Sequence, residues 1–259
     1  MKNARPVSYA QASLLAAACL VGGLGLWWLL SRAGLFPPSA LPTPGEVAAG
    51  LGEEVRTGRL ADDLVASLFR VAAGYTLAVV TSIPLGLALG HSPRWRAALL
   101  PTVNFFRSLS PLAWIPFAIL WFGIGDAPVV FLIFMATFFP LVLATLAAVA
   151  EVPAVYFQVA HEYGFRGTEL LTRITLPAVM PQVITALRVA GGVAWLVLVA
   201  AEMIAGRDGL GFAIWDARNG LRLDLLVCGM IVIGLTGALL DWLLSLLSKL
   251  PGVRWGYEH

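Results

Sequence analysis

Charged residues are scarce in this sequence. Only 12% of its 259 residues are Asp, Glu, Lys or Arg, whereas 59% are hydrophobic and the mean hydropathy is +0.84. A soluble domain of this length is typically about half apolar and about one quarter charged. The composition therefore excludes a single soluble domain and predicts an all-α, polytopic membrane protein.

Motifs that carry covalent chemistry are also missing. The two cysteines, Cys19 and Cys228, both lie in apolar stretches, which predicts buried thiols and not a disulfide or metal pair. The sequence has no Gly-x4-Gly-Lys-Ser/Thr phosphate loop and no Gly-x-Ser-x-Gly elbow, and His161-Glu162 lacks the second histidine of a zinc motif. We therefore expect no catalytic residue, no cofactor, no metal and no nucleic-acid partner.

Six apolar stretches reach the length of ~20 residues that a helix needs to cross a bilayer. The first begins like a signal peptide, but no small-residue cleavage site follows it, so we predict a retained helix. In the second, Gly86 and Gly90 form a small-xxx-small pair that favours close helix packing. The alternative is that the two glycines merely flank the loop that follows. The predicted spans are 9–30, 64–90, 99–122, 129–150, 183–205 and 225–247.

The segments between the spans predict the organisation of the chain. Segment 46–59 is polar enough for a surface helix, whereas 91–96 and 206–224 are predicted loops. We divide the chain into an N-terminal transmembrane helix (1–33), an extracytoplasmic connecting segment (34–63), a core of five transmembrane helices (64–250) and a cytoplasmic tail (251–259).

Basic residues in the short loops predict the orientation. By the positive-inside rule they mark the cytoplasmic side, so both termini are expected in the cytoplasm of a cell that carries this protein in its inner membrane. The basic residues assigned to that side are Lys2, Arg5, Arg94, Arg96, Arg166, Arg173, Lys249 and Arg254.

Loop 151–182 between the fourth and fifth spans is polar and amphipathic. On a helical wheel Tyr156, Phe157, Ala160, Tyr163 and Gly164 share one arc. Gly164 is where the first helix is expected to stop. A second helical segment follows, and Pro177 and Pro181 are predicted to end it. A helix, a glycine turn, a helix and a proline stop predict a docking surface.

The pattern of this loop resembles the EAA loop of ABC-importer permeases. The resemblance rests on Ala160, Gly164, Ile174 and Leu176-Pro177, while Gln158 stands where the family usually has an acid. It implies that the loop is cytoplasmic and couples the permease to a separate ATPase. The implied coupling residues are Gln158, Ala160, Gly164, Ile174, Leu176 and Pro177.

Two further stretches, 111–126 and 195–218, resemble permeases of nitrate, sulfonate and taurine importers, in which Asp126 fills the place of an acid after the WFGIG sequence. The resemblance implies a type I, MetI-like permease for a small solute, such as one of these anions. Its implied partners are cytoplasmic ABC ATPase subunits, an extracytoplasmic substrate-binding protein and a second permease. One such loop per chain predicts a homodimer, because the importer has two ATPase sockets.

Ionisable residues inside spans are costly, so each one is a functional hypothesis. Glu202, Arg188 and Arg107 are our candidates for the translocation path or a gate. For Glu202 the functional hypotheses are that it lines the path or pairs with an arginine. The alternatives are that Glu202 hydrogen-bonds a neighbouring helix near the interface and that the arginines extend to the membrane surface. Asp241 in the sixth span is predicted to be a packing partner.

A second class of function remains open at this point. An ion-coupled secondary transporter would also be a polytopic helical protein, but it needs acids near the middle of the bilayer and often contains an internal repeat. This sequence has few such acids and no visible repeat. The permease interpretation is therefore preferred, and ATP dependence of transport distinguishes the two.

Overall fold

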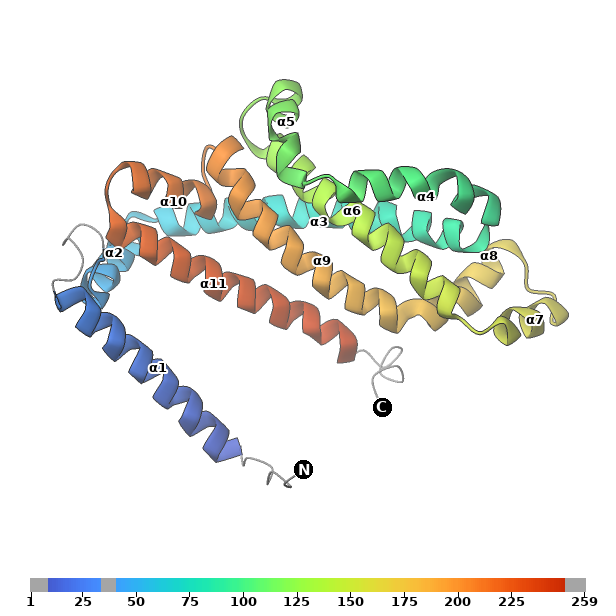
Figure 1. Ribbon diagram of the computed structural model, residues 1–259, viewed down its shortest axis with the longest axis horizontal. Helices are drawn as coiled ribbons and strands as arrows, with labels where there is room; N and C mark the ends of the chain where they lie inside the picture. The colour runs from blue at the N-terminus through green and yellow to red at the C-terminus, as the bar shows by residue number, and fades with distance from the viewer. Residues whose placement is uncertain (1–8, 34–40, 250–259) are drawn as a thin grey trace. The chain divides into compact units, whose positions relative to one another are not determined.

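The computed structural model describes residues 9–33 and 41–249, which contain helices and no β-strand (Figure 1). The predicted tail 251–259 and part of the predicted connecting segment lie outside these ranges. The α-helices are α1 Tyr9–Arg32, α2 Pro44–Thr57, α3 Arg59–His91, α4 Pro93–Ser108, α5 Ile115–Phe122, α6 Asp126–Glu151, α7 Ala154–Glu162, α8 Gly167–Leu170, α9 Leu176–Ala205, α10 Leu210–Asn219 and α11 Leu223–Ser245. Short 3-10 and π turns are η1 Pro111–Trp114, η2 Leu171–Thr175 and η3 Leu246–Lys249.

Four of these helical segments are long and apolar enough to cross a membrane: Arg59–His91, Asp126–Glu151, Gly167–Ala205 and Leu223–Lys249. A bent pair, Pro93–Ser108 with Pro111–Phe122, adds a fifth span if it is counted as one. Helix α1 covers the first predicted span, and its apolar part within the searched residues, Ala17–Arg32, is shorter. The prediction of an all-α polytopic membrane protein is confirmed.

The third predicted span, 99–122, is not one straight helix. Its two halves meet at an angle of 87°. The break lies at Leu109 and Ser110, whose ψ angles of 133° and 128° are extended. The cause is Pro111, because a proline disfavours the helical conformation at the residue before it.

Two predicted loops are largely helical. In segment 91–96 helix α3 continues to His91 and α4 begins at Pro93, so Ser92 alone separates them, and its side chain caps α4. The predicted loop 206–224 contains α10. In both cases a short turn reverses the chain, so the polar segment does not need an open loop.

The predicted proline stop after loop 151–182 is also wrong. Helical structure continues from Gly167 through Ala205, with Pro177 in the first turn of α9 and Pro181 inside it. A π turn explains this, because the Leu176 amide donates to the carbonyl of Leu171, five residues earlier. The widened turn precedes Pro177, whose missing N–H then leaves the helix intact.

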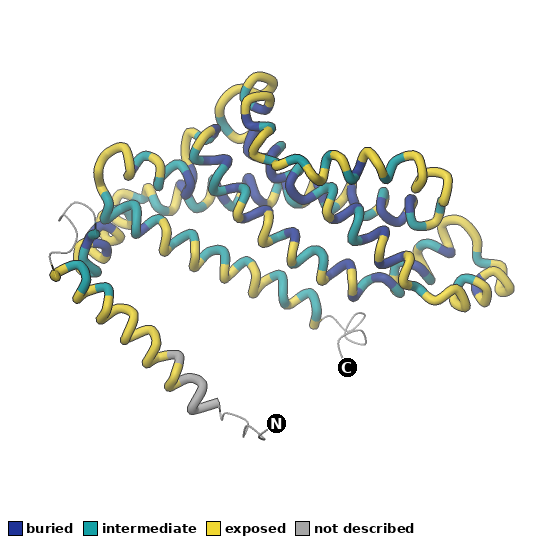
Figure 2. The backbone as a smooth tube through the Cα atoms, in the orientation of Figure 1, coloured by how far each residue is buried: buried dark blue, intermediate teal, exposed yellow. Residues whose placement is uncertain are grey.

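The chain forms two compact units, and the larger one consists of Ala61–Ala213 with Val232 onward. Its centre is α6, which packs against α9 and, through three glycines, against α3. A Cβ at Gly74, Gly86 or Gly90 would lie 2.6–2.8 Å from side chains of α6. The predicted close approach at Gly86 and Gly90 is therefore confirmed, and buried residues follow α6 and α9 (Figure 2).

The second half of α11 packs on α9 in the same unit. The Trp195 indole donates to the Ile233 carbonyl at 3.2 Å, and a Cβ at Gly237 would lie 2.7 Å from that indole nitrogen. Farther along, Leu244 contacts Gly191. Small residues therefore let these two helices approach closely, as is common between helices in lipid.

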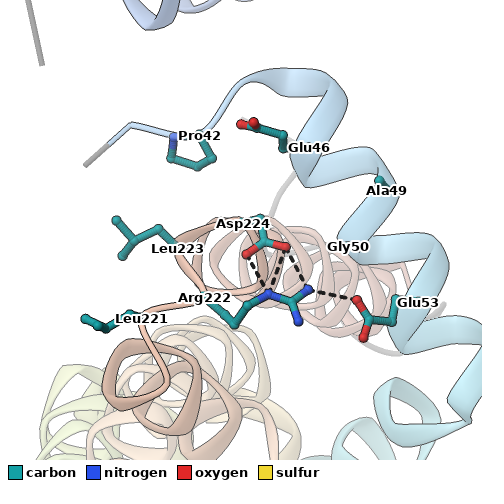
Figure 3. Close-up of a pocket in the computed structure, with 9 residues that line it drawn as sticks. All are labelled: Pro42, Glu46, Ala49, Gly50, Glu53, Leu221, Arg222, Leu223 and Asp224. Atoms are coloured by element: carbon teal, nitrogen blue, oxygen red, sulfur yellow. Dashed lines mark hydrogen bonds and ion pairs between the residues drawn. The ribbon is translucent and has the colours of Figure 1, made fainter. Parts of the chain in front are cut away.

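The smaller unit combines residues up to Leu60 with Ile214–Ile231. Helix α2 begins with a capping box in which Thr43 and Glu46 satisfy each other's backbone amides. The predicted surface helix 46–59 corresponds to α2. Arg222 donates to Glu53 at 2.8 Å and to Asp224 at 2.9 Å, beside a polar cavity of about 410 Å³ (Figure 3). These hydrogen bonds raise the pKa of Arg222 and fasten α2 to the turn before α11.

The cysteines differ in environment. Cys228 on α11 is buried, as predicted, whereas Cys19 on α1 is exposed. The apolar stretch around Cys19 is a helix that presents its described leucines outward, including Leu20 at 69% exposure. Membership of an apolar stretch therefore did not by itself predict burial within the chain.

The α3–α6 contact gives a first test. Gly86→Ala is expected to lower the unfolding temperature in detergent, because the added methyl would lie 2.6 Å from Thr145 Cβ and 2.8 Å from the Val142 carbonyl oxygen. Overpacking of this kind typically costs about 1–3 kcal/mol. Gly234→Ala on α11 is the control, because nothing lies within 4 Å of its Cβ and alanine favours helix by about 1 kcal/mol. Equal shifts for both variants would contradict the proposed packing.

Candidate functional site

Loop 151–182 folds as two helical segments joined by a tight turn. Helix α6 ends at Glu151 because Pro153 follows, and Val152 before it is extended with ψ 123°. Helix α7 then runs to Glu162. After the turn, α8 and η2 continue directly into α9. The loop is therefore a helical continuation of a membrane-length helix and not a flexible connector.

The turn after α7 is a Schellman motif centred on Gly164. The Phe165 amide donates to the Ala160 carbonyl at 2.9 Å, and the Gly164 amide donates to the His161 carbonyl at 3.1 Å. Gly164 has φ +83°, and Gly167 has φ +54°. A left-handed residue is required at this position of the motif, and glycine adopts that conformation without strain.

Three elements meet beneath the loop. The Phe157 ring makes an edge contact with the His91 imidazole, with centroids 5.7 Å apart, at the end of α3. His91 Nε2 lies 3.0 Å from the hydroxyl oxygen of Thr175, which is fully buried in η2. Ala160 is buried as well. Helix α7 therefore rests on the end of α3 and on η2, which leads into α9.

The arc predicted for α7 is only partly buried. Ala160 is buried and Phe157 half-buried, but Tyr156 is 56% exposed and Tyr163 is 80% exposed. Only the turn of α7 that contains Phe157 and Ala160 is therefore packed against the elements beneath it. The remaining aromatic residues, together with Val159, form an exposed apolar surface of the kind that marks protein contacts.

A groove of about 590 Å³ opens between the two arms of the loop. Of the predicted coupling residues, Ile174 and Pro177 line it, whereas Leu176 packs into the core below and Gln158 is exposed. Ala160 is buried and Gly164 lies in the turn that ends α7, so only Ile174 and Pro177 of the predicted set line the groove. The complete lining is Glu151, Val152, Pro153, Tyr156, Arg173, Ile174, Pro177, Ala178 and Gln182.

A second polar site lies at the other end of α3 and α9. The Arg70 guanidinium on α3 is 2% exposed, and it bonds to Glu202 Oε1 at 2.8 Å, to Asp126 Oδ1 at 2.6 Å, and to Asp208 through both its carbonyl, at 2.8 Å, and its carboxylate. These acids come from α9, from the first residue of α6, and from the turn after α9. We call Arg70, Ser67, Asp126, Glu202 and Asp208 the Arg70 cluster.

Glu202 is completely buried, and its carboxylate is fully hydrogen-bonded. The Ser67 hydroxyl lies 2.9 Å from both carboxylate oxygens, and the Gly211 amide donates to Oε2 at 2.9 Å. In a low-dielectric interior such a charge is tolerated only when it is paired and hydrogen-bonded, and breaking a buried pair typically costs about 3–5 kcal/mol. The structure therefore shows Glu202 both paired with an arginine and hydrogen-bonded to neighbouring elements, so two of the expectations for this residue apply together.

Glycines in the AGRDGLG sequence allow the chain to close around Glu202. A Cβ at Gly206, Gly209 or Gly211 would collide with the backbone or side chain of Glu202. Gly209 has φ +101°, and its amide donates to Asp63 Oδ1 at 2.8 Å. The tight turn thus places the Gly211 amide beside Glu202 and Asp208 beside Arg70.

The two predicted arginines lie elsewhere. Arg188 on α9 forms an ion pair with Asp241 on α11 at 3.4 Å, which fits the packing role predicted for Asp241. Arg107 is exposed in the last turn of α4. Neither belongs to the Arg70 cluster, so the structure does not bring the three predicted path residues together.

Sequence reasoning did not select Arg70, Ser67 or Asp208 as site residues. A signal was present, because Arg70 is a charged residue inside a predicted span, and such residues default to functional hypotheses. Its partner was not identifiable from hydropathy, since pairing depends on the rotation of α3 relative to α9. The Arg70 cluster and the loop lie about 30 Å apart along α3, at ~1.5 Å per residue.

Residues 82–251 match the family described as binding-protein-dependent transport system inner membrane component. The taurine transport system permease protein TauC of Escherichia coli is 35% identical, over 87% of this chain and 84% of that protein. The bicarbonate transport system permease protein CmpB of Synechocystis sp. is also 35% identical, over 90% and 87%.

A solved structure shares the fold. It is an inward-facing conformation of the MetNI methionine ABC transporter, with a TM-score of 0.66 and 15% identity over 73% of this chain and 94% of the solved chain. This confirms the predicted MetI-like fold. Together with the relatives above, it shows that the chain belongs to the binding-protein-dependent transport system inner membrane component family, as a transmembrane permease subunit of an ABC importer and not as an enzyme in its own right.

Proposed function

We propose that this permease couples to a separate ATPase through loop 151–182, and that two copies of the chain form the translocation path of the importer. The observation that carries the proposal is the contact of α7 with the end of α3 and with η2, which leads into α9. The His91–Phe157 and His91–Thr175 contacts connect the loop to both helices. A force applied to α7 therefore reaches two membrane-length helices at once.

The continuity of α9 supports this role. No break separates α8 from the far end of α9, so the helix transmits displacement as a rigid element. Closure of the ATPase dimer on ATP would move the loop, and the loop would tilt α3 and α9 together. This is alternating access without any covalent step on the permease itself.

The exposed surface of the loop fits an ATPase partner. It offers Tyr156, Val159 and Tyr163 as apolar contacts beside a groove of about 590 Å³. We propose Gln158, Ala160, Gly164, Ile174, Leu176 and Pro177 as the coupling residues, of which Leu176 and Ala160 act by holding the surface in shape. We propose that the loop and both termini lie in the cytoplasm, as the positive-inside rule predicts.

The solute is proposed to be small and to carry an oxyanion group. The support is the solutes for which the two relatives are named: taurine, which has a sulfonate, and bicarbonate. A substrate-binding protein on the extracytoplasmic side is proposed to deliver it. Arg188 and Arg107 stay candidates for the translocation path, because a guanidinium attracts an anion. Glu202 is buried, so we propose that it belongs to a gate and does not line the path.

The function is tested by uptake into proteoliposomes that contain the permease and its ATPase. We expect accumulation of an oxyanion solute only with ATP on the side of the ATPase and with the loaded binding protein on the opposite side. Uptake driven by an ion gradient in the absence of ATP would contradict the proposal.

Gly164 gives the sharpest test of the loop. Gly164→Asp is expected to weaken ATPase co-purification and uptake, since any side chain at φ +83° is strained by about 1–2 kcal/mol and a charge is added to the docking surface. A loss of ~1.4 kcal/mol in docking corresponds to about tenfold weaker binding. Gly164→Ala is expected to be milder.

Two control variants separate the causes. Asparagine tolerates the left-handed conformation, so Gly164→Asn should bind the ATPase if backbone strain is decisive and should fail if the surface itself is occupied. Gly52→Asp on α2 adds the same charge at an open position and should leave coupling unchanged. Full ATPase recovery and undiminished uptake with Gly164→Asp would remove this loop from the mechanism.

Assembly is tested by native mass spectrometry of the purified complex. We expect two copies of this chain per complex, because each copy has one loop and an importer has two ATPase sockets. Detection of a single copy beside a different permease would show a heterodimer. The measurement is independent of activity and of the identity of the solute.

A further inference from the structure

The Arg70 cluster holds together segments that are far apart in the sequence. One guanidinium on α3 binds the first residue of α6, the end of α9 and the turn that follows α9. A backbone hydrogen bond from the Gly125 amide to the Ala205 carbonyl, 2.9 Å long, joins the same two regions. This end of the bundle is therefore closed by polar contacts, whereas its middle is closed by apolar packing.

The cluster has a buried half and an exposed half. Glu202 is fully buried, but the side chains of Asp126 and Asp208 are 61% and 60% exposed. A buried ion pair is costly to break, whereas an exposed carboxylate exchanges an arginine for water at little cost. The contacts to Asp126 and Asp208 can therefore open while Arg70 and Glu202 stay paired.

The charges make this contact dependent on Arg70. Three carboxylates surround one guanidinium, so Asp126 and Asp208 repel each other when Arg70 does not lie between them. Asp126 also has a second favourable environment, because it lies in the first turn of α6, where the helix dipole stabilises a negative charge. The remaining Arg70–Glu202 pair is neutral and keeps its hydrogen bonds to Ser67 and Gly211.

The chain before α6 is suited to movement. Gly123 and Gly125 have φ angles of +78° and +137°, and nothing lies within 4 Å of a Cβ built on either glycine. The turn therefore has open space around a backbone that only glycine adopts readily. Release of Asp126 would free the start of α6 to swing about these two residues.

We propose that Arg70 is the positioning residue of an ionic gate, which holds Asp126 and Asp208 together in the closed state and releases them when the path opens to the side opposite loop 151–182. The inference rests on the proposed function, because it assigns that end of α9 to the side from which the binding protein delivers solute. Glu202 keeps Arg70 fixed, and the two aspartates are the moving contacts. The gate and the coupling loop lie at opposite ends of the same two helices, so they respond to one tilt.

The gate is tested with Asp126→Asn and Asp208→Asn, alone and combined, in reconstituted complexes. Weakening the closed state should raise ATP hydrolysis without binding protein, by about fivefold in the double variant, which is the lower end of ordinary coupling factors. Stimulation by the loaded binding protein should fall toward one. A purely structural role would lower assembly instead, without raising hydrolysis per assembled complex.

Accessibility gives a readout that does not depend on ATP hydrolysis. Ala205 is fully buried behind the Gly125 contact. In a chain with Cys19 and Cys228 replaced by serine, Ala205→Cys should resist a membrane-impermeant thiol reagent. The same thiol should react when the two asparagine substitutions are present.

Matched variants complete the design. Asp126→Glu and Asp208→Glu keep the carboxylates and should retain most of the stimulation. Glu53→Gln also removes an exposed carboxylate from an arginine that binds two acids, but it does so on α2, and its hydrolysis should equal that of the wild type.

Two results would overturn the gate. One is an unchanged stimulation ratio in the double variant, together with an unreactive thiol when Ala205→Cys is added to it. The other is failure of the double variant to assemble, because the proposal requires the exposed contacts to be dispensable for folding. Failure of the wild-type complex to show ATP-dependent uptake would instead contradict the proposed function, so the two failures are distinguishable.

Discussion

A buried guanidinium sets the arrangement of one end of this permease. In the apolar interior of a membrane protein every charge and every backbone polar group needs an internal partner. Arg70 satisfies this constraint by drawing together Glu202, Asp126 and Asp208 from three segments. The turn after α9 packs so closely around Glu202 that a Cβ at Gly209 or Gly211 would collide with this side chain.

The middle of the larger unit follows a different rule. Helices in lipid gain little from the hydrophobic effect between them, so close packing of small residues replaces it. Gly74, Gly86 and Gly90 bring α3 onto α6, and Gly191 and Gly237 bring α11 onto α9. Helices α3 and α9 are therefore tightly packed in the middle and held by polar contacts at their ends. Loop 151–182 lies at one end of these two helices, and the Arg70 cluster lies at the other.

The bent segment between α4 and α5 shows what a local sequence pattern can predict about a helix and what it cannot. Hydropathy identifies 99–122 correctly as an apolar stretch, but Pro111 turns the chain by 87°. Pro177 shows the opposite outcome, because a π turn at Leu171–Thr175 lets the helix continue through it. Both prolines lack the backbone N–H and restrict the preceding residue in the same way. The backbone conformation before each proline decides whether the helix breaks there or continues.

The sequence by itself determined the membrane class, the approximate spans, the helix and glycine turn of loop 151–182 and the resemblance to importer permeases, because hydropathy, capping and motif spacing are local properties. Tertiary structure alone decided which charges pair. Glu202 was a candidate from the sequence, yet its partner Arg70 is 132 residues away along the chain. Such a pair depends on the rotation and depth of two helices, and packing against α6 sets both.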